Sequence, residues 1–217
     1  MSQGDADRDW NADLARCGDA RAWRREQSLW ALWVYRFGRR VDAMPEGFSR
    51  RWRTKAYWLM FRVVETVTGI SLPKDCRIGP GLRIWHFGGI FVNPATVIGA
   101  NCTLRQGVTL GNRVPDGPCP VLEDGVELGA YAQVLGGVRL GAGCRVGAMA
   151  VVLQDVPPGA TAVGNPARIL PLPTADGTAP SAGTGLVPPS ASDAGMPVSR
   201  TPVQDEPIKT PTTSIGG

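Results

Sequence analysis

Aliphatic residues recur at every sixth position through the middle of the chain. A first block consists of Leu72, Ile78, Ile84, Ile90, Ile98, Leu104 and Leu110. The step from Ile90 to Ile98 is eight residues, which we interpret as a two-residue insertion at Thr96-Val97. A second block keeps the period through Leu122, Leu128, Val134, Leu140, Val146 and Val152. A period of six fits neither an α-helix nor an alternating strand. It predicts a parallel β-solenoid in which three hexapeptides form each triangular coil.

A second column of residues supports this interpretation. Four positions after most anchors stands a small or β-branched residue, as in Cys76, Gly88, Cys102, Val108, Val126, Ala132, Val138, Cys144 and Ala150. We expect both columns to fill the interior of the coil. Three of the five cysteines then act as small buried apolar side chains.

Residues 1–70 show a period near 3.6 and predict helices over residues 20–39 and 50–67. The expected buried stripes are Trp23, Leu29, Trp30, Trp33, Val34 and Phe37, and then Trp52, Ala56, Leu59, Met60, Val63 and Val67. Gly38 and Pro45-Glu46-Gly47 should separate the helices, and Gly69 should end the second.

The chain therefore divides into a helical region (1–70), a β-solenoid domain (71–170) and a tail (171–217). The tail is rich in Pro, Ser, Thr, Gly and Ala. We expect it to be disordered, because it has too few apolar side chains to offset the entropy of ordering.

Charge and cysteine content narrow the function classes. The net charge is +4, and residues 1–70 hold 13 of the 23 Lys and Arg against 9 acids. We expect the polar start not to be a signal peptide, and no apolar run approaches the roughly 18 residues of a membrane span. We expect a cytoplasmic protein with no nucleic-acid partner. The cysteines have no metal-ligand spacing, so no metal is predicted.

Three segments resemble the serine O-acetyltransferases of the hexapeptide acyltransferase superfamily: residues 78–86, 106–111 and 156–168. The resemblance implies a mainly β fold, a left-handed parallel β-helix behind an N-terminal α-helical region. It also implies a homotrimer or dimer of trimers that binds acetyl-CoA between neighbouring β-helices, with no metal. The short helical region is similar to that of relatives among surface-polysaccharide enzymes.

His86 is the only histidine, and it aligns with the family's catalytic histidine. It follows the anchor Ile84 by two residues and should face outward. An imidazole there suits a general base that activates an alcohol. Gln106 is expected in the same slot one coil later, either as a residue that orients the imidazole or acceptor or as a polar ladder residue.

Several residues of the serine site are absent. Ser71, Trp85 and Cys119 stand where the resemblance implies charged or ionisable side chains. The loss of those charged or ionisable side chains disfavours a zwitterionic acceptor such as serine. The aromatic rings of Trp85 and Phe87 instead suit stacking on a sugar ring. Cys119 is a further candidate for acceptor binding.

The resemblance also carries acetyl-CoA binding over to four positions. These are Ala130, Ala148, Gly164 and Arg168.

The leading hypothesis is an acetyl-CoA-dependent O-acetyltransferase acting on serine, by family, or on a glycan hydroxyl, which we favour. The alternative is a non-catalytic scaffold in polysaccharide biosynthesis. A γ-type carbonic anhydrase is rejected because one histidine per chain cannot build its zinc site. The terminal residues 214–217 lack the C-terminal isoleucine that binds the partner enzyme in cysteine synthase, so we expect no such complex. Residues 20–67 could contact the inner membrane face peripherally, although we favour packing against other subunits.

Overall fold

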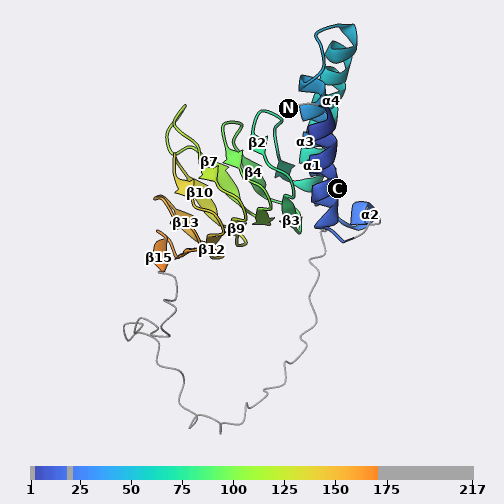
Figure 1. The fold of residues 1–217 in the computed structure, drawn as a ribbon. Coiled ribbons are helices and arrows are strands. Elements are labelled where there is room, and N and C mark those ends of the chain that lie inside the picture. The colour runs from blue at the N-terminus through green and yellow to red at the C-terminus, as the bar shows by residue number, and fades with distance from the viewer. Residues whose placement is uncertain (1–2, 19–21, 171–217) are drawn as a thin grey trace, which may run out of the picture. The chain divides into compact units, whose positions relative to one another are not determined.

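The computed structural model describes residues 3–18 and 22–170, with side chains from residue 7 onward (Figure 1). The described part forms one compact unit within residues 1–176. The predicted disordered tail, residues 171–217, lies outside the described residues.

Among the residues that the structure describes, four helices precede the β-strands, and their bounds are α1 Gln3–Ala15, α2 Ala22–Arg25, α3 Ser28–Asp42 and α4 Phe48–Thr68. The helix predicted over residues 20–39 is therefore broken between α2 and α3. Gly69 ends α4 as predicted, because its left-handed backbone (φ 64°) lets its N–H donate to the Glu65 carbonyl at 2.8 Å.

Gly38 does not end a helix, contrary to the sequence prediction. It lies inside α3, where a Cβ atom would approach the Tyr57 ring to 2.6 Å and the Lys74 Cβ to 2.9 Å. The missing side chain lets Tyr57 of α4 pack directly against α3. The glycine therefore serves close helix packing.

The predicted buried stripes need correction. In α3 the buried side chains include Leu32, Tyr35 and Arg36, whereas Trp30, Trp33 and Phe37 are only half-buried. In α4 the error is larger, because the helix buries its other face. Its buried side chains are Tyr57, Phe61 and Thr68. Most of the predicted stripe is exposed, namely Trp52, Ala56, Leu59, Val63 and Val67.

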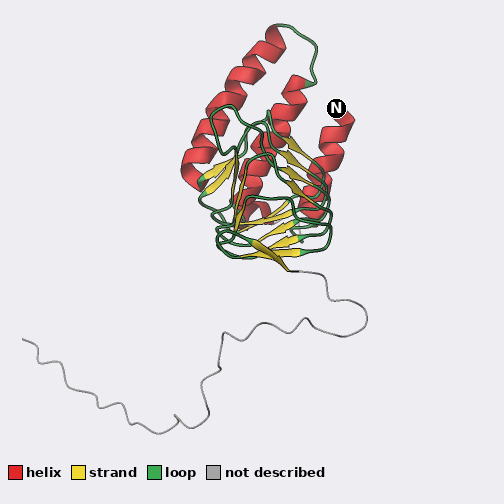
Figure 2. Ribbon diagram, turned by 90° about the vertical axis from the view of Figure 1, so that its left-hand side faces the viewer, coloured by secondary structure: helices red, strands yellow, loops and turns green. Residues whose placement is uncertain are grey.

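In the described part of the chain, fifteen short strands build a left-handed parallel β-helix, which confirms the predicted fold class. One sheet contains β1 Ile70–Ser71, β4 Ile90–Val92, β7 Thr109–Gly111, β10 Gln133–Leu135 and β13 Val151–Val152. A second contains β2 Arg77–Ile78, β5 Val97–Ile98, β8 Val121–Leu122 and β11 Arg139–Leu140. The third contains β3 Arg83–Trp85, β6 Thr103–Arg105, β9 Glu127–Leu128, β12 Arg145–Val146, β14 Thr161–Val163 and β15 Arg168–Leu170. Figure 1 shows the stacked coils and Figure 2 views them end-on; among the described strands only β14 and β15 pair antiparallel.

The aliphatic anchors are all buried, which confirms the repeat, but the insertion lies elsewhere than predicted. Ile84 pairs with Leu104 across β3 and β6, twenty residues apart, whereas Val92 pairs with Leu110 across β4 and β7, eighteen apart. The two extra residues of the first coil therefore lie between Ile84 and Val92, not at Thr96-Val97. Val92 is the true anchor.

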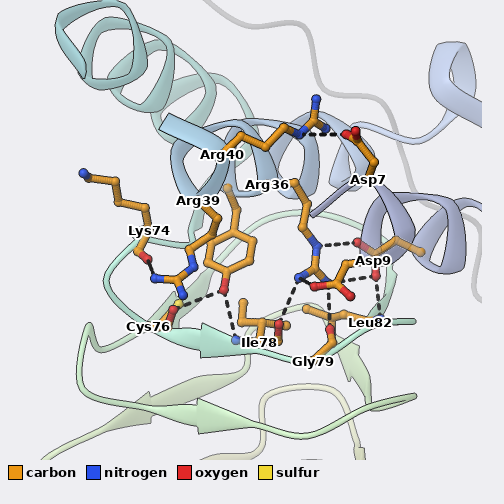
Figure 3. Close-up of polar contacts among 12 residues, drawn as sticks. Asp7, Asp9, Arg36, Arg39, Arg40, Lys74, Cys76, Ile78, Gly79 and Leu82 are labelled. Carbon is orange, nitrogen blue, oxygen red and sulfur yellow. Dashed lines mark hydrogen bonds and ion pairs between the residues drawn. The ribbon is translucent and has the colours of Figure 1, made fainter. Parts of the chain in front are cut away.

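A buried polar network attaches the helices to the first coil (Figure 3). Arg36 of α3 is fully buried and donates to both carboxylate oxygens of Asp13 of α1, from Nε at 2.9 Å and from Nη2 at 3.1 Å. It also donates to the carbonyls of Ile78 at 2.9 Å and Gly79 at 2.6 Å. Asp13 in turn accepts the Leu82 N–H at 2.8 Å. One guanidinium thus joins α1, α3 and the β-helix.

Candidate active site

His86 lies on a two-residue bulge at the corner between β3 and β4. Five residues, 86–90, separate the paired positions Trp85 and Phe91, whereas only three separate their partners Arg105 and Thr109. The bulge turns sharply because His86, Gly88 and Gly89 all have positive φ (65°, 99° and 67°). A left-handed backbone is uncommon for a residue with a side chain. Among the described residues Asn101, Asp116, Tyr131 and Met149 share it, so the bulge rather than φ distinguishes His86.

The His86 imidazole lines a pocket of about 320 Å³ between the β3–β4 corner and the start of α3. The lining residues are Arg25, Glu26, Gln27, Ser28, Arg83, Trp85, His86 and Phe87. The predicted acceptor residues Trp85 and Phe87 therefore share one pocket with His86, and about half of each ring is exposed. The helical region supplies the opposite wall.

Two charged residues that sequence reasoning missed hold this wall in place. Arg83 of β3 donates from Nη2 to Glu26 Oε1 at 2.9 Å and forms a second, ion-pair contact with Glu26 Oε2. The same guanidinium stacks on the Trp85 ring at 4.2 Å. The bond to Glu26 raises the pKa of Arg83. The clamp formed by Glu26 and Arg83 therefore fixes the indole beside His86.

The slot predicted for Gln106 needs correction. The Gly107 N–H donates to Gly88, and the Tyr131 N–H donates to Gln106 in the next coil. Gln106 is therefore stacked on Gly88, and His86 projects beyond that slot on the bulge. The Gln106 Oε1 atom is buried and has no hydrogen-bond partner among the described residues.

The predicted acetyl-CoA positions follow this same corner down the β-helix. Gly88, Gln106 and Ala130 occupy equivalent turn positions, as their carbonyl hydrogen bonds show. Ala148 and Gly164 continue the column, because Val146 pairs with Ala162 two residues before them. Arg168 is exposed on β15 beside Val163. At about 4.8 Å per strand, the four steps from Gly88 to Gly164 span about 19 Å. Apart from Gln106, the corner therefore presents a long track of small residues with a cation near its far end.

Comparisons with known proteins agree with this geometry. Residues 119–154 match the bacterial transferase hexapeptide (six repeats) family. The serine acetyltransferase of Escherichia coli K12 is 36% identical over 148 residues, which cover 67% of this chain and 52% of that protein. The soybean serine acetyltransferase apoenzyme superposes with a TM-score of 0.63 at 32% identity, over 77% of this chain and 68% of the soybean chain. A serine acetyltransferase solved in complex with CoA gives a TM-score of 0.57 at 30% identity, over 66% and 57%.

The chain belongs to the serine acetyltransferase-like branch of the hexapeptide-repeat acyltransferases. It spans about half the length of the first curated relatives that it matches, 47% of a Synechococcus elongatus serine acetyltransferase and 52% of that of E. coli.

Cys119 is one of the positions at which this chain lacks the side chain expected in the serine site of the family. Cys119 lies in the loop between β7 and β8, at a different corner from His86, and it does not line the histidine pocket of its own chain. Partial burial raises the pKa of its thiol. A raised thiol pKa disfavours the thiolate, which is the nucleophilic form of cysteine.

A second groove was not predicted. It has a volume of about 460 Å³, runs along the outer face of the third sheet and meets the histidine pocket at Trp85. Arg16, Arg105 and Arg145 line it against one acid, Glu127. Arginine immediately after an anchor, as at Arg105, is the sequence signal that would have indicated it. The excess of cations suits a phosphate-bearing ligand.

Proposed function

We propose that this chain is an acetyl-CoA-dependent O-acetyltransferase whose general base is His86. The observation that carries the proposal is the bulge. The chain's only histidine is pushed outward into a pocket at one end of a corner track of small residues. A serine acetyltransferase of the same fold has been solved with CoA, which supports the choice of co-substrate.

His86 would accept the proton of the acceptor hydroxyl as the oxygen attacks the thioester carbonyl. The acetyl C–S bond then breaks, and the imidazolium returns the proton to the departing thiolate. Such proton transfer contributes roughly 10²–10⁴ in rate. Gln106, whose Oε1 has no hydrogen-bond partner among the described residues, is proposed to orient the acceptor.

Ala130, Ala148 and Gly164 are proposed to let the pantetheine arm lie against the corner backbone. Arg168 is proposed to pair with a phosphate group of CoA. No metal takes part in this proposal.

The proposed acceptor is a sugar hydroxyl. Trp85 and Phe87 offer two half-exposed rings beside the base. A free amino acid would need a carboxylate for its ammonium group, and Glu26, the one acid that lines the pocket, is already bound to Arg83. We therefore favour a glycan over serine, with Cys119 contributing to acceptor binding only from a neighbouring chain.

The proposed assembly is a homotrimer or dimer of trimers in the cytoplasm, by family likeness. A role in polysaccharide biosynthesis and a peripheral membrane contact through residues 20–67 belong to the same proposal.

His86→Ala tests the base. We expect loss of nearly all thiol release from acetyl-CoA, with an unchanged circular dichroism spectrum and unchanged CoA binding by calorimetry. Activity retained within about tenfold would reject His86 as the base. Absence of turnover by the wild-type chain with every acceptor would favour the scaffold alternative.

An acceptor panel tests the substrate class. Thiol release should be measured with free serine, nucleotide sugars and oligosaccharides under the same conditions. We expect turnover with a carbohydrate. Turnover with serine alone would overturn the glycan assignment while leaving the acetyltransferase assignment intact.

A further inference from the structure

Helix α4 has two apolar faces, and only one is covered. The inner face packs Tyr57 and Phe61 against α3 and the first coil. The outer face carries Phe48, Trp52, Leu59, Val63 and Val67, whose exposed fractions are 78%, 59%, 68%, 54% and 62%. We call these five residues the outer stripe.

The outer stripe is a continuous band. At 3.6 residues per turn its five members fall within about 100° of the helix circumference, nearly opposite the buried side chains. The band continues into an apolar groove of about 610 Å³ between α4 and the preceding helices. Trp23, Trp30 and Trp33 line the groove across from Leu59 and Val63. Exposed apolar surface of this extent indicates an interaction site.

Cations border the outer stripe. On the same helical wheel, Arg51, Lys55 and Arg62 line one edge, and Arg53 lies at the other. Together with Arg50, these residues give helix α4 five cations. Its single acid is Glu65, so the formal charge of the helix is 5 − 1 = +4. Glu65 pairs with Arg62 at 3.4 Å.

We propose that the outer stripe of α4 binds an anionic lipid surface, with the helix lying in the plane of the headgroups. A stripe of Trp, Phe, Leu and Val bordered by Arg and Lys fits the boundary between acyl chains and anionic headgroups. No helix within residues 3–18 and 22–170 is long and apolar enough to cross a membrane.

Charge decides between lipid and a second copy of the chain. A symmetric contact through the outer stripe would bring two helices of charge +4 together, and α4 offers only one acid to offset them. Anionic headgroups supply the missing negative charge. The sequence pattern favours packing of residues 20–67 against other subunits, but it does not show which face of α4 is buried. The buried inner face now accounts for Tyr57 and Phe61 and leaves the outer stripe to be explained.

This inference refines the peripheral contact within the proposed function, but its test measures lipid binding and requires no turnover. The full chain should be floated with vesicles of phosphatidylcholine containing 30 mol% phosphatidylglycerol and with pure phosphatidylcholine vesicles. We expect binding to the anionic vesicles at low salt and its loss at high salt.

Variants locate the binding surface. Arg51→Gln, Lys55→Gln and Arg62→Gln together should weaken partitioning about 100-fold, at about fivefold per cation. The matched control replaces three exposed arginines of the β-helix and its loops, Arg77, Arg113 and Arg139, with Gln, and should bind much more tightly than the α4 triple.

The apolar contribution of the outer stripe is tested with the double variant Leu59→Ser/Val63→Ser. We expect this variant to bind the anionic vesicles more than tenfold more weakly than the wild-type chain does. Phe91→Ser and Val114→Ser, equally exposed on the β-helix and its loop, are the matched control. The proposal is overturned if the wild-type chain stays unbound at low salt, or if either α4 variant binds as tightly as its control. A lower molar mass of Leu59→Ser/Val63→Ser in light scattering would instead assign the outer stripe to a second copy.

Discussion

Arg36→Met would test how strongly one buried guanidinium holds the helices to the β-helix. Methionine fills a similar volume but donates no hydrogen bond. The substitution leaves the buried Asp13 carboxylate with only neutral backbone donors, those of Leu82 and Gly81. It also strips the carbonyls of Ile78 and Gly79 of the bonds that Arg36 donates.

The expected cost is large because both side chains of the ion pair are fully buried. Removing one partner of a buried pair costs about 3–5 kcal/mol of unfolding free energy. At about 2–4 °C per kcal/mol for a protein of this size, the melting temperature should fall by roughly 6–20 °C. Arg40→Met, one turn later in α3, removes an ion pair with the largely exposed Asp7 and should cost at most about 1 kcal/mol.

The penalty should also depend on pH. Burial already raises the pKa of Asp13, and the bond and charge of Arg36 oppose that rise. Without Arg36 the pKa of folded Asp13 rises further above its unfolded value of 3.8. The folded variant then holds the proton more tightly than the unfolded chain does, so its stability falls as pH rises through the folded pKa. The gap from wild type should widen with pH, by at most about 1.4 kcal/mol per pH unit.

Thermal and urea unfolding of both variants and the wild type, at pH 5 and pH 8, would provide the measurement. We expect the Arg36 variant to be the less stable at both pH values and to lose more at pH 8. The reasoning is refuted if Arg36→Met costs no more than Arg40→Met at pH 8, or if its penalty shrinks as the pH rises.

Three further predictions concern packing and the site. Gly38→Ala should cost a net ~1–2 kcal/mol in thermal unfolding, because the clash with Tyr57 exceeds the gain in helix propensity. Glu26→Gln should raise the KM for the acceptor about fivefold with little change in kcat, because it weakens the hold on Arg83 and on the ring stacked over it. Cys119→Ser should retain kcat, with any change confined to KM, because Cys119 lies at a different corner from His86 and does not line the histidine pocket of its own chain; a large loss of kcat would contradict this.

The fold was predictable because the β-helix stacks equivalent positions from coil to coil. An aliphatic residue at every sixth position therefore identifies the residues that fill its interior. The same degeneracy hid the bulge. Ile90 and Val92 are both aliphatic, and either fits as an anchor. Only the pairing of Val92 with Leu110 shows that the extra residues are at His86.

The histidine pocket was predictable only in part. Trp85 and Phe87 are neighbours of His86 in sequence, and they indeed share its pocket. Glu26 lies sixty residues away and enters through the break between α2 and α3, which helical periodicity did not foresee. For α4, two apolar faces satisfy the same period, and periodicity alone cannot say which of them meets the core.

The one-dimensional stacking of the coils has a consequence for how binding spreads along the molecule. Each coil bonds only to its neighbours, and α3 and α4 brace the first coil while the last ends at β15. Local opening should therefore be easiest at β13–β15, where backbone amides exchange fastest, and rarest beside His86. A ligand lying along the whole corner would contact both the coil that opens most easily and the coil that opens most rarely. Its binding would then slow exchange some 19 Å from the histidine without moving a single strand.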